Sequence, residues 1–501
     1  MSLTSALNTA QSIFNNTGTQ SNTVSNNIAN AGNANYTRRQ AVLTTSLAGA
    51  QVVQIARAQE PQLQAQYLTS SSQDAAQERL LQGLEDIKAT MGGNDYETAP
   101  STYLSALQTA LQNYAASPSS TTAAQSAVTA AQDVATSLNN ATTSLQGIRE
   151  DADKEIAGDV TTLNSLLTQF KTANDAVKTS SDGSAQQADA MDTRDGLLTQ
   201  IAGIIGITTV TRAGNDMAIY TSDGTPLFDT VARTVSFTAT PGYSAGSQGN
   251  QVYIDGTPLQ PGSNPQTTGQ GSLQALLQIR DVIAPTYQSQ LDEMGRGLVS
   301  MFSETYFNTN NVADPQNGSK APGLFVWTQS DGTAGGTPTG STVIPGIAGS
   351  ITVNTAFVTS QGGNPNLLRD GGANNTSTNQ NYTANLTGDS GYSDQLDAFA
   401  SAMDADMTFD PSTGIDSKSS LLEYASNSVG WVESNRSGAS NAAENTSAGL
   451  SRSQQAYSNE TGVNLDEELS LLMDIEQSYK AGTKILNAVD EMLQSLLQIV
   501  N

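Results

Sequence analysis

Residues 465–500 read LDEELSLLMDIEQSYKAGTKILNAVDEMLQSLLQIV, and this closing stretch decides the expected fold. Its apolar positions recur in alternating steps of four and three residues, which is the a/d spacing of a coiled-coil seam. A helix over the whole stretch is about 54 Å long at 1.5 Å per residue. The seam positions are Ile475, Tyr479, Gly482, Leu486, Val489, Leu493, Leu496 and Val500.

The start of this helix carries clear signals. Asn464 and Glu467 stand as the N-cap and the N3 residue of a capping box. Three acids over 466–468 lie in the first turn, where the helix dipole favours negative charge. Three further leucines precede the seam, one three-residue step out of phase with it: Leu465, Leu469 and Leu472.

A second apolar row, formed by Ile485, Met492 and Ile499, runs beside the first near the end of the chain. The last turns are therefore apolar over more than one face. Because a single partner helix covers only one face, we expect this row to meet a further partner.

The opening residues carry a weaker seam of the same spacing, with polar residues in its middle. Its positions are Leu3, Leu7, Ala10, Phe14, Thr17, Ser21, Val24 and Ile28. We expect the apolar members Leu3, Leu7, Phe14, Val24 and Ile28 to pack against Leu486, Val489, Leu493, Leu496 and Val500.

By spacing alone, an amphipathic helix packed into its own domain core is the simpler interpretation of each seam. Two features favour an intermolecular role. Both seams occupy the extreme ends of the chain, and each is too long or too apolar to be left without a partner. Such segments are expected to fray in an isolated subunit and to fold when assembly buries them.

Composition excludes several chemistries. The 501 residues include neither cysteine nor histidine, so disulfides, zinc-thiolate clusters and Ser-His-Asp catalysis are ruled out. There are 21 Lys and Arg against 47 Asp and Glu, a formal net charge of −26. This balance argues against nucleic acid or an anionic membrane as a partner.

The acids are unevenly distributed. None occurs before residue 60, whereas the last 42 residues carry eight acids and two lysines. We expect this difference to favour pairing of the two ends, although salt screens it. No run of 18 apolar residues predicts a membrane span, and no cationic and apolar leader opens the chain.

In the middle of the chain, predicted helices alternate with β-prone segments inserted between them. The runs 39–43 and 51–55 flank a Ser-Leu-Ala-Gly turn and predict a β-hairpin. Helical periodicity follows over 61–198, broken at Gly92-Gly93 and Ser117-Pro118, and a further helix starts at 272 and is interrupted at Pro285. Helices are expected again over 394–407 and from 417 towards 457.

Between these helices lie two β-prone inserts. The sequence Asp-Gly-Thr-Pro-Leu occurs at 223–227 and again at 255–259, each time after a β-prone run, and predicts two hairpin turns. A second insert, rich in Gly, Asn, Thr and Ser, contains short β-prone islands at 324–327 and 351–353.

The expected fold class is α+β, mainly helical: terminal coiled-coil-like helices, a long-helix bundle and small β-rich inserted domains in an elongated, nested architecture. The expected terminal domain comprises 1–35 and 461–501. The expected bundle comprises 36–200, 272–310 and 393–460, with the hairpin near 37–58. The expected β-rich inserts are 201–271 and 311–392.

Short motifs at both ends resemble the bacterial flagellar rod, hook and hook-associated axial proteins. At the start these are Ser25-Asn26-Asn27-Ile28-Ala29-Asn30 and Tyr36-Thr37-Arg38, and at the end 462–468 with Tyr479. Two interior stretches, 192–198 and 271–281, are most similar to the members of that family that join hook to filament. The Asn-Thr-Pro-Gly-Tyr that usually precedes the Arg is replaced by 31–36, without the proline.

The resemblance implies a non-enzymatic structural subunit of the extracellular flagellum, with no cofactor. It implies assembly with copies of itself in a ring, with hook subunits, and with a second junction protein or flagellin. It also implies export through the flagellar channel without a cleaved signal peptide. A cytoplasmic chaperone is expected on the C-terminal helix, where the row Ile485, Met492 and Ile499 faces the chaperone or neighbouring subunits.

Other interpretations remain open. Within the family they are a hook or distal-rod subunit, or flagellin; outside it, a secreted adhesin or an enzyme that uses carboxylates of the β-rich inserts. The spacing of Asp404, Asp406 and Asp410 begins like that of an EF-hand calcium-binding loop. However, Phe409 stands at the position where the turn of that loop requires glycine. The stretch Gly269-Gln270-Gly271 lacks the third glycine of the glycine-rich motif that binds dinucleotides.

Overall fold

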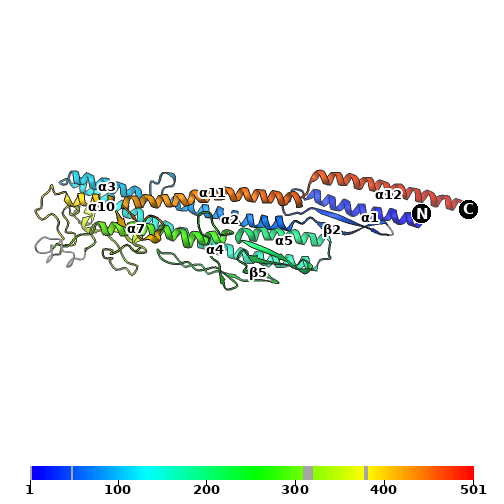
Figure 1. Ribbon diagram of the computed structural model, residues 1–501, viewed down its shortest axis with the longest axis horizontal. Helices are drawn as coiled ribbons and strands as arrows, with labels where there is room; N and C mark the ends of the chain where they lie inside the picture. Colours follow the sequence, from blue (N-terminus) through cyan, green and yellow to red (C-terminus); the bar gives the residue numbers. More distant parts are fainter. Residues whose placement is uncertain (1–2, 47–48, 308–319, 377–381, 501) are drawn as a thin grey trace.

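The chain folds into a long rod in which both termini lie at one end (Figure 1). This computed structural model describes residues 3–46, 49–307, 320–376 and 382–500. Two terminal helices, α1 (Leu3–Ala29) and α12 (Leu465–Val500), pack together at that end. The α+β, mainly helical and elongated fold class is therefore confirmed.

Long helices carry the rest of the rod. α2 and α11 pack along each other, and α4 packs against α3, α5 and α7. Pro61 and Pro100 occupy the first turns of α2 and α3, where a missing N–H costs nothing. These helices are α2 (Pro61–Thr90), α3 (Pro100–Ala116), α4 (Thr121–Thr179), α5 (Ala185–Ile204), α6 (Ser272–Gln278), α7 (Ala284–Met301), α10 (Asp394–Asp404) and α11 (Leu421–Thr461).

Short antiparallel sheets complete the fold. The hairpin β1 (Arg39–Ser46) and β2 (Gly49–Arg57) follows α1 and packs on it. Gly224 and Gly256 take positive φ angles at the two predicted Asp-Gly turns. The remaining strands are β3 (Ile207–Thr211), β4 (Met217–Thr221), β5 (Pro226–Asp229), β6 (Val231–Ala232), β7 (Val235–Ser236), β8 (Tyr253–Ile254), β9 (Thr257–Pro258), β10 (Phe325–Val326), β11 (Thr352–Val353), β12 (Met407–Thr408) and β13 (Lys418–Ser419).

Four features of the helices differ from the sequence prediction. The helix expected over 394–407 ends at Asp404, because Met407 pairs with Ser419 in the β12–β13 sheet, and α11 starts at Leu421 instead of 417. The helical run expected over 61–198 is also broken by 180–184, a Ser-Ser-Asp-Gly-Ser turn in which Gly183 has a positive φ. Pro285 does not interrupt its helix; a π-helical turn, Ile279–Ile283, precedes it within one continuous helical segment.

The rod contains two separate hydrophobic cores. One is built on α4 residues 124–145, together with α2, α3, α7, α10 and α11. The other is built on α4 residues 152–173, with α5, α6 and strands β3 to β8. The buried polar residues Gln146 and Arg149 lie between these two stretches of α4, and buried Asp153 lies at the start of the second.

Among the helices that the structure describes, none combines the length and the apolar character needed to cross a lipid bilayer.

Candidate assembly site

The two terminal helices form an antiparallel pair. Asn27, near the end of α1, meets Glu468 at the start of α12, with its Nδ2 3.0 Å from the carboxylate Oε2. Further along, the Phe14 and Tyr479 rings meet edge to face with centroids 5.1 Å apart. Gly482 lies so close to Ile13 that an added Cβ would approach its Cγ2 to 2.8 Å. The absence of a side chain at this seam position therefore lets the helices approach closely.

Among the described side chains of α12, a narrow ridge is buried against α1. It consists of Glu468, Ile475, Gly482 and Val489, which are seven residues apart. A spacing of seven keeps one face of a supercoiled helix towards its partner. On α1, Ala10, Thr17 and Val24 are buried at the same spacing.

The other predicted seam residues remain partly or largely accessible. Leu3, Phe14, Ile28, Leu472 and Ile485 are half-buried. Exposed positions are Leu7 at 43%, Tyr479 at 53%, Leu486 at 39%, Met492 at 48% and Leu493 at 42%. Leu465 and Leu469, at the start of α12, are also exposed. The side chains of Leu496, Ile499 and Val500 lie outside the described part of the structure.

The partners expected for Phe14, Val24 and Ile28 of the N-terminal seam are wrong. Phe14 was expected among residues 486–500, but it meets Tyr479 and Gly482 instead. In the antiparallel pair, Val24 and Ile28 lie near the start of α12, because Asn27 is level with Glu468. The spacing of each seam was sufficient to define a face, but it contained no information on how far one helix slides along the other.

The Asn-rich motif at the end of α1 builds a buried junction. Asn27 is fully buried, and its Nδ2 also donates to the Arg39 carbonyl at 2.8 Å. Its Oδ1 accepts from the Tyr36 hydroxyl at 2.8 Å and from the Arg39 N–H at 3.1 Å. One side chain thereby ties α1, the linker, the hairpin and α12 together. The other motif residues lie around it: Ser25, Asn26 and Ala29 are exposed, and Asn30 donates to the Asn26 carbonyl at 2.9 Å.

Arg38 joins the two ends of the chain. Its Nε lies 2.7 Å from Oε1 of the buried Glu468, and its Nη1 lies 3.0 Å from Oε2 of the exposed Glu467. Asn464 caps α12, since its Oδ1 accepts from the Asp466 N–H at 3.0 Å. The Glu467 side chain pairs with Arg38, so among the described residues only the Asn464 half of the predicted capping box forms.

Two arginines fasten the hairpin to α5. Arg39 Nη2 lies 2.7 Å from both Asp189 and Asp192, and Arg57 bridges Asp192 at 2.7 Å and Asp195 at 2.5 Å. Burial alone lowers the pKa of Arg57, but the charges of Asp195 and Asp192 outweigh it and raise this pKa above its usual value. Arg57 therefore keeps its positive charge where it binds these two carboxylates.

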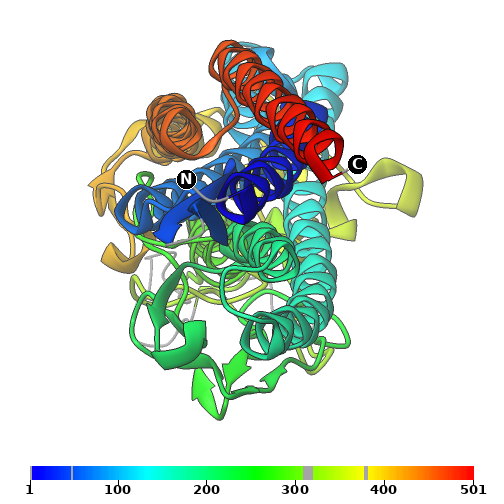
Figure 2. The same cartoon turned by 90° about the vertical axis from the view of Figure 1, so that its right-hand side faces the viewer.

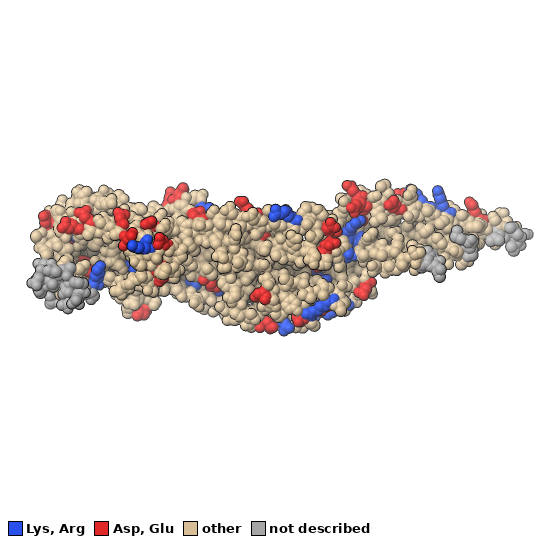
Figure 3. Space-filling view, in the orientation of Figure 1, with Lys and Arg blue, Asp and Glu red and all other residues tan. Residues whose placement is uncertain are grey.

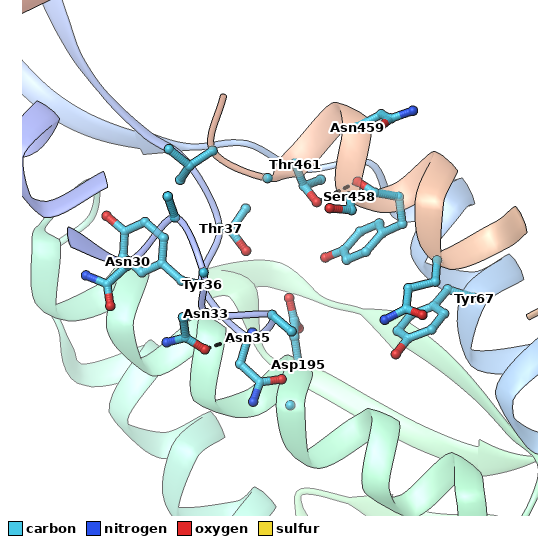
Figure 4. A pocket seen from close by; sticks show the side chains of 18 of the residues that line it. Asn30, Asn33, Asn35, Tyr36, Thr37, Tyr67, Asp195, Ser458, Asn459 and Thr461 are labelled. Carbon is cyan, nitrogen blue, oxygen red and sulfur yellow. Dashed lines mark hydrogen bonds between the residues drawn. The ribbon is translucent and has the colours of Figure 1, made fainter. Parts of the chain in front are cut away.

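A polar cavity of about 590 Å³ opens where the terminal pair meets the rest of the rod (Figure 4). Its walls are the linkers 30–37 and 462–465, with α2, α5 and the end of α11. The rings of Tyr67 and Tyr457 stack on one side with centroids 6.0 Å apart. We call this place, where the terminal pair meets the rest of the rod, the joint.

Several residues of this joint were not predicted. The sequence singled out 192–198 as a motif, but the pairing of Asp192 and Asp195 with Arg39 and Arg57 links residues more than 130 positions apart. The signal that was available is the charge distribution: all three bases before residue 60, Arg38, Arg39 and Arg57, pair with acids from later in the chain.

The loops considered for cations and nucleotides have local structural roles. Asp410 accepts from the Ser412 and Val343 N–H groups, and Asp404 accepts from the Gln108 amide at 2.7 Å. Gly271 has a φ of +84° and packs against the Ile204 backbone, where a Cβ would clash. Within the described ranges, no group of three or more acidic side chains is arranged to hold a metal ion.

Comparison with known proteins gives two family matches. The profile of "Flagellar hook-associated protein FlgK helical domain" matches residues 84–309, and that of "Flagellar basal body rod FlgEFG protein C-terminal" matches residues 454–499. No curated protein sequence matches the chain. A solved structure, the flagellar hook junction protein FlgK from Burkholderia pseudomallei, is similar at 18% identity and a TM-score of 0.43. That similarity covers 53% of this chain and 47% of the other, so the chain spans about half of that protein's length.

Proposed function

Since the chain belongs to the family of flagellar hook-associated proteins, we propose that it is a structural subunit of the junction between the flagellar hook and filament. The proposal assigns no catalysis to the chain. Its assembly surface is the terminal helix pair, formed by α1 and α12.

The observation that carries the proposal is the exposed apolar surface of α12. Large side chains, among them Leu465, Leu469, Met473, Leu486 and Leu497, are between 39% and 65% exposed along its whole length. Burial of apolar surface contributes about 25 cal/mol for each Å² removed from water, so covering this helix strongly favours association. Exposed apolar surface of this extent is typical of interaction sites.

The lengths of the two helices add a second argument. In the antiparallel register, the start of α1 is level with about residue 492 of α12, so the last turns of α12 extend beyond it. Figure 1 shows the C-terminus beyond the N-terminus at the tip of the rod. The exposed residues Leu493 and Leu497 lie in this extension, and a neighbouring subunit would cover them.

The shape of the chain suits a layered tube. Both termini lie at one end of the rod, and the second insert lies at the opposite end (Figure 1). The terminal pairs would stack at the centre, with the inserts outside. The partners proposed are copies of this chain in a ring, hook subunits, a second junction protein or flagellin, and an export chaperone on α12. The proposed location is the extracellular flagellum, reached through the flagellar export channel.

Imaging of a strain that lacks this protein tests the proposal. We expect hooks without filaments and monomeric flagellin in the medium, and restoration of filaments by the full chain. Hooks missing altogether would point to a hook or distal-rod subunit, and intact filaments would contradict a junction role.

A further inference from the structure

We propose a specific contact between adjacent copies of this chain, which rests on the proposed function. The hairpin face of one copy, formed by Leu43, Val52 and Val53, packs against the α12 stripe of the next copy, formed by Leu465, Leu469 and Met473. The contact uses two different surfaces, so it is heterologous and links copies in series.

The hairpin face is apolar, with Leu43 and Val53 exposed and Val52 half-buried. The hairpin packs on α1, which contacts both strands: Asn16 Nδ2 donates to the Ala50 carbonyl at 2.6 Å, and the Val52 N–H donates to Asn16 Oδ1 at 3.1 Å. The register between β1 and β2 shifts after Val42, so the bulge places both Val52 and Val53 opposite Leu43. Leu43 is 44% and Val53 57% exposed. A two-stranded sheet is marginally stable alone, so a cover on this face would stabilise it.

The α12 stripe is the matching surface. Leu465, Leu469 and Met473 are four residues apart and therefore lie on one side of the helix. They are 47%, 50% and 65% exposed. Glu468 and Ile475, which are buried, face α1 instead. Successive stripe residues are about 6 Å apart along the helix, and neighbouring strands are about 4.8 Å apart, so side chains of the two surfaces can interdigitate.

The charges around the α12 stripe favour the hairpin of a second copy as the surface that binds it. The stripe is flanked by the exposed acids Asp466, Glu467, Asp474 and Glu476, and Figure 3 shows acidic side chains gathered over the start of α12. A two-fold contact of α12 with α12 would place these like charges together. The hairpin belongs to residues 1–59, which contain no acid, and its exposed Gln40, Thr44 and Thr45 offer amide and hydroxyl donors to carboxylates.

The contact cannot form within one copy. α1 packs against both α12 and the hairpin, and the end-on view shows α12 and the hairpin on different sides of α1 (Figure 2). Val52 is level with Asn16 of α1, whereas Leu469 is level with about residue 26. This difference of about ten helical residues is about 15 Å. The contact therefore sets adjacent copies about 15 Å apart along the axis, in a stepped arrangement.

Engineered cysteines test this contact directly, because the chain has none of its own. The full chain carrying Leu43→Cys with Leu469→Cys replaces the natural protein in filament-bearing cells, and isolated flagella are treated with a short bismaleimide. We expect a ladder of dimers and larger products, since each copy carries both surfaces. Val53→Cys with Met473→Cys is the second pair, in case the first disturbs assembly.

Each single-cysteine variant should remain monomeric under the same treatment. A matched control is Leu43→Cys with Leu386→Cys, because Leu386 is 56% exposed and lies in the second insert. Dimers from a single variant would indicate a two-fold contact and overturn the proposal. A product containing a different flagellar protein would assign the stripe to that protein and also overturn it.

The result also separates this contact from the proposed function. Restored filaments without cross-links from either pair would overturn the contact and leave the junction role intact. Failure of the unmodified chain to restore filaments would overturn both.

Discussion

Glu468 is a fully buried carboxylate that accepts from Asn27 and pairs with Arg38. Hydrogen bonds to a charged group are worth about 1.5–3 kcal/mol each, and a buried charge depends on its partners. Glu468→Gln keeps the shape but removes the charge. We expect it to weaken the docking of α12 on α1 by about 2 kcal/mol, seen as faster amide hydrogen exchange over the first turns of α12.

The neighbouring Glu467→Gln is the matched control. Glu467 also pairs with Arg38, but its side chain is 57% exposed, and exposed pairs contribute about 0–1 kcal/mol. Equal exchange rates in the two variants would show that burial of Glu468 is not what holds the helix pair.

Asp292, on α7, provides a pH prediction. Burial raises its pKa to about 6, against the lowering effect of the Gly346 and Ala348 N–H groups and the Gln288 amide. The unfolded carboxyl ionises near 3.8, so at intermediate pH the folded state binds more protons. The stability due to this group is therefore greatest below pH 4 and falls by roughly 3 kcal/mol as the pH rises through about 6.

Asp292→Asn removes this titration with little change in volume. The melting temperature of the natural chain, measured relative to that of the variant, should decrease between about pH 4 and pH 6.5. Parallel melting curves over that range would contradict the assignment of a raised pKa to Asp292.

At the scale of elements, Asp192 holds the hairpin on α5. Its two carboxylate oxygens bind Arg39 and Arg57, and all three side chains are at most 10% exposed. Removing one partner of a buried pair costs about 3–5 kcal/mol, although Asp189 and Asp195 keep part of the binding here. We expect Asp192→Asn to weaken the free energy of docking of the hairpin on α5 by about 2–3 kcal/mol, so that the terminal pair moves more freely relative to the rod.

The measurement is a distance distribution between spin labels on Lys480→Cys and Lys154→Cys, both at exposed positions. The distribution should broaden in the Asp192→Asn background. Asp189→Asn is the control, because Asp189 pairs with Arg39 but is 67% exposed. An unchanged distribution with Asp192→Asn would show that other contacts fix the joint.

Local elements were well predicted from sequence where the signal is local. Spacing identified both terminal helices, and the Asp-Gly pairs located the turns of β4–β5 and β8–β9. The boundary at Asp404 was missed because β12 pairs with a strand ten residues later in the chain. Helical periodicity contains no signal for such a pairing. The short break at 180–184 was missed because apolar periodicity continues on both sides of it.

The contacts at the joint between the terminal pair and the rod were the least predictable from sequence. Asn27, Arg38 and Glu468 were identified by motif or charge, but their mutual contact joins residues over 400 positions apart. The partners of Phe14, Val24 and Ile28 were wrong for the same reason: the contact of Asn27 with Glu468 fixes the alignment of the helices, and the seams alone allow several alignments. Long-range polar contacts therefore carry information that single-sequence patterns lack.

At the scale of the whole molecule, the two cores are independent of the terminal pair. Of the residues that the structure describes in α1 and α12, none belongs to either core. A chain ending at Asn464 should therefore keep its main melting transition, with a change below about 1 kcal/mol in the free energy of unfolding. Circular dichroism of the purified chain checks this, and a collapsed transition would show that α12 stabilises the rod itself.

The most direct test of the junction role is electron microscopy of cells whose only copy of this protein is either the full chain, the chain ending at Asn464, or Leu493→Asp. We predict filaments attached to hooks with the full chain, and bare hooks with the other two, even though the shortened chain is folded. Attached filaments with the chain ending at Asn464 would contradict assembly through the terminal helix pair.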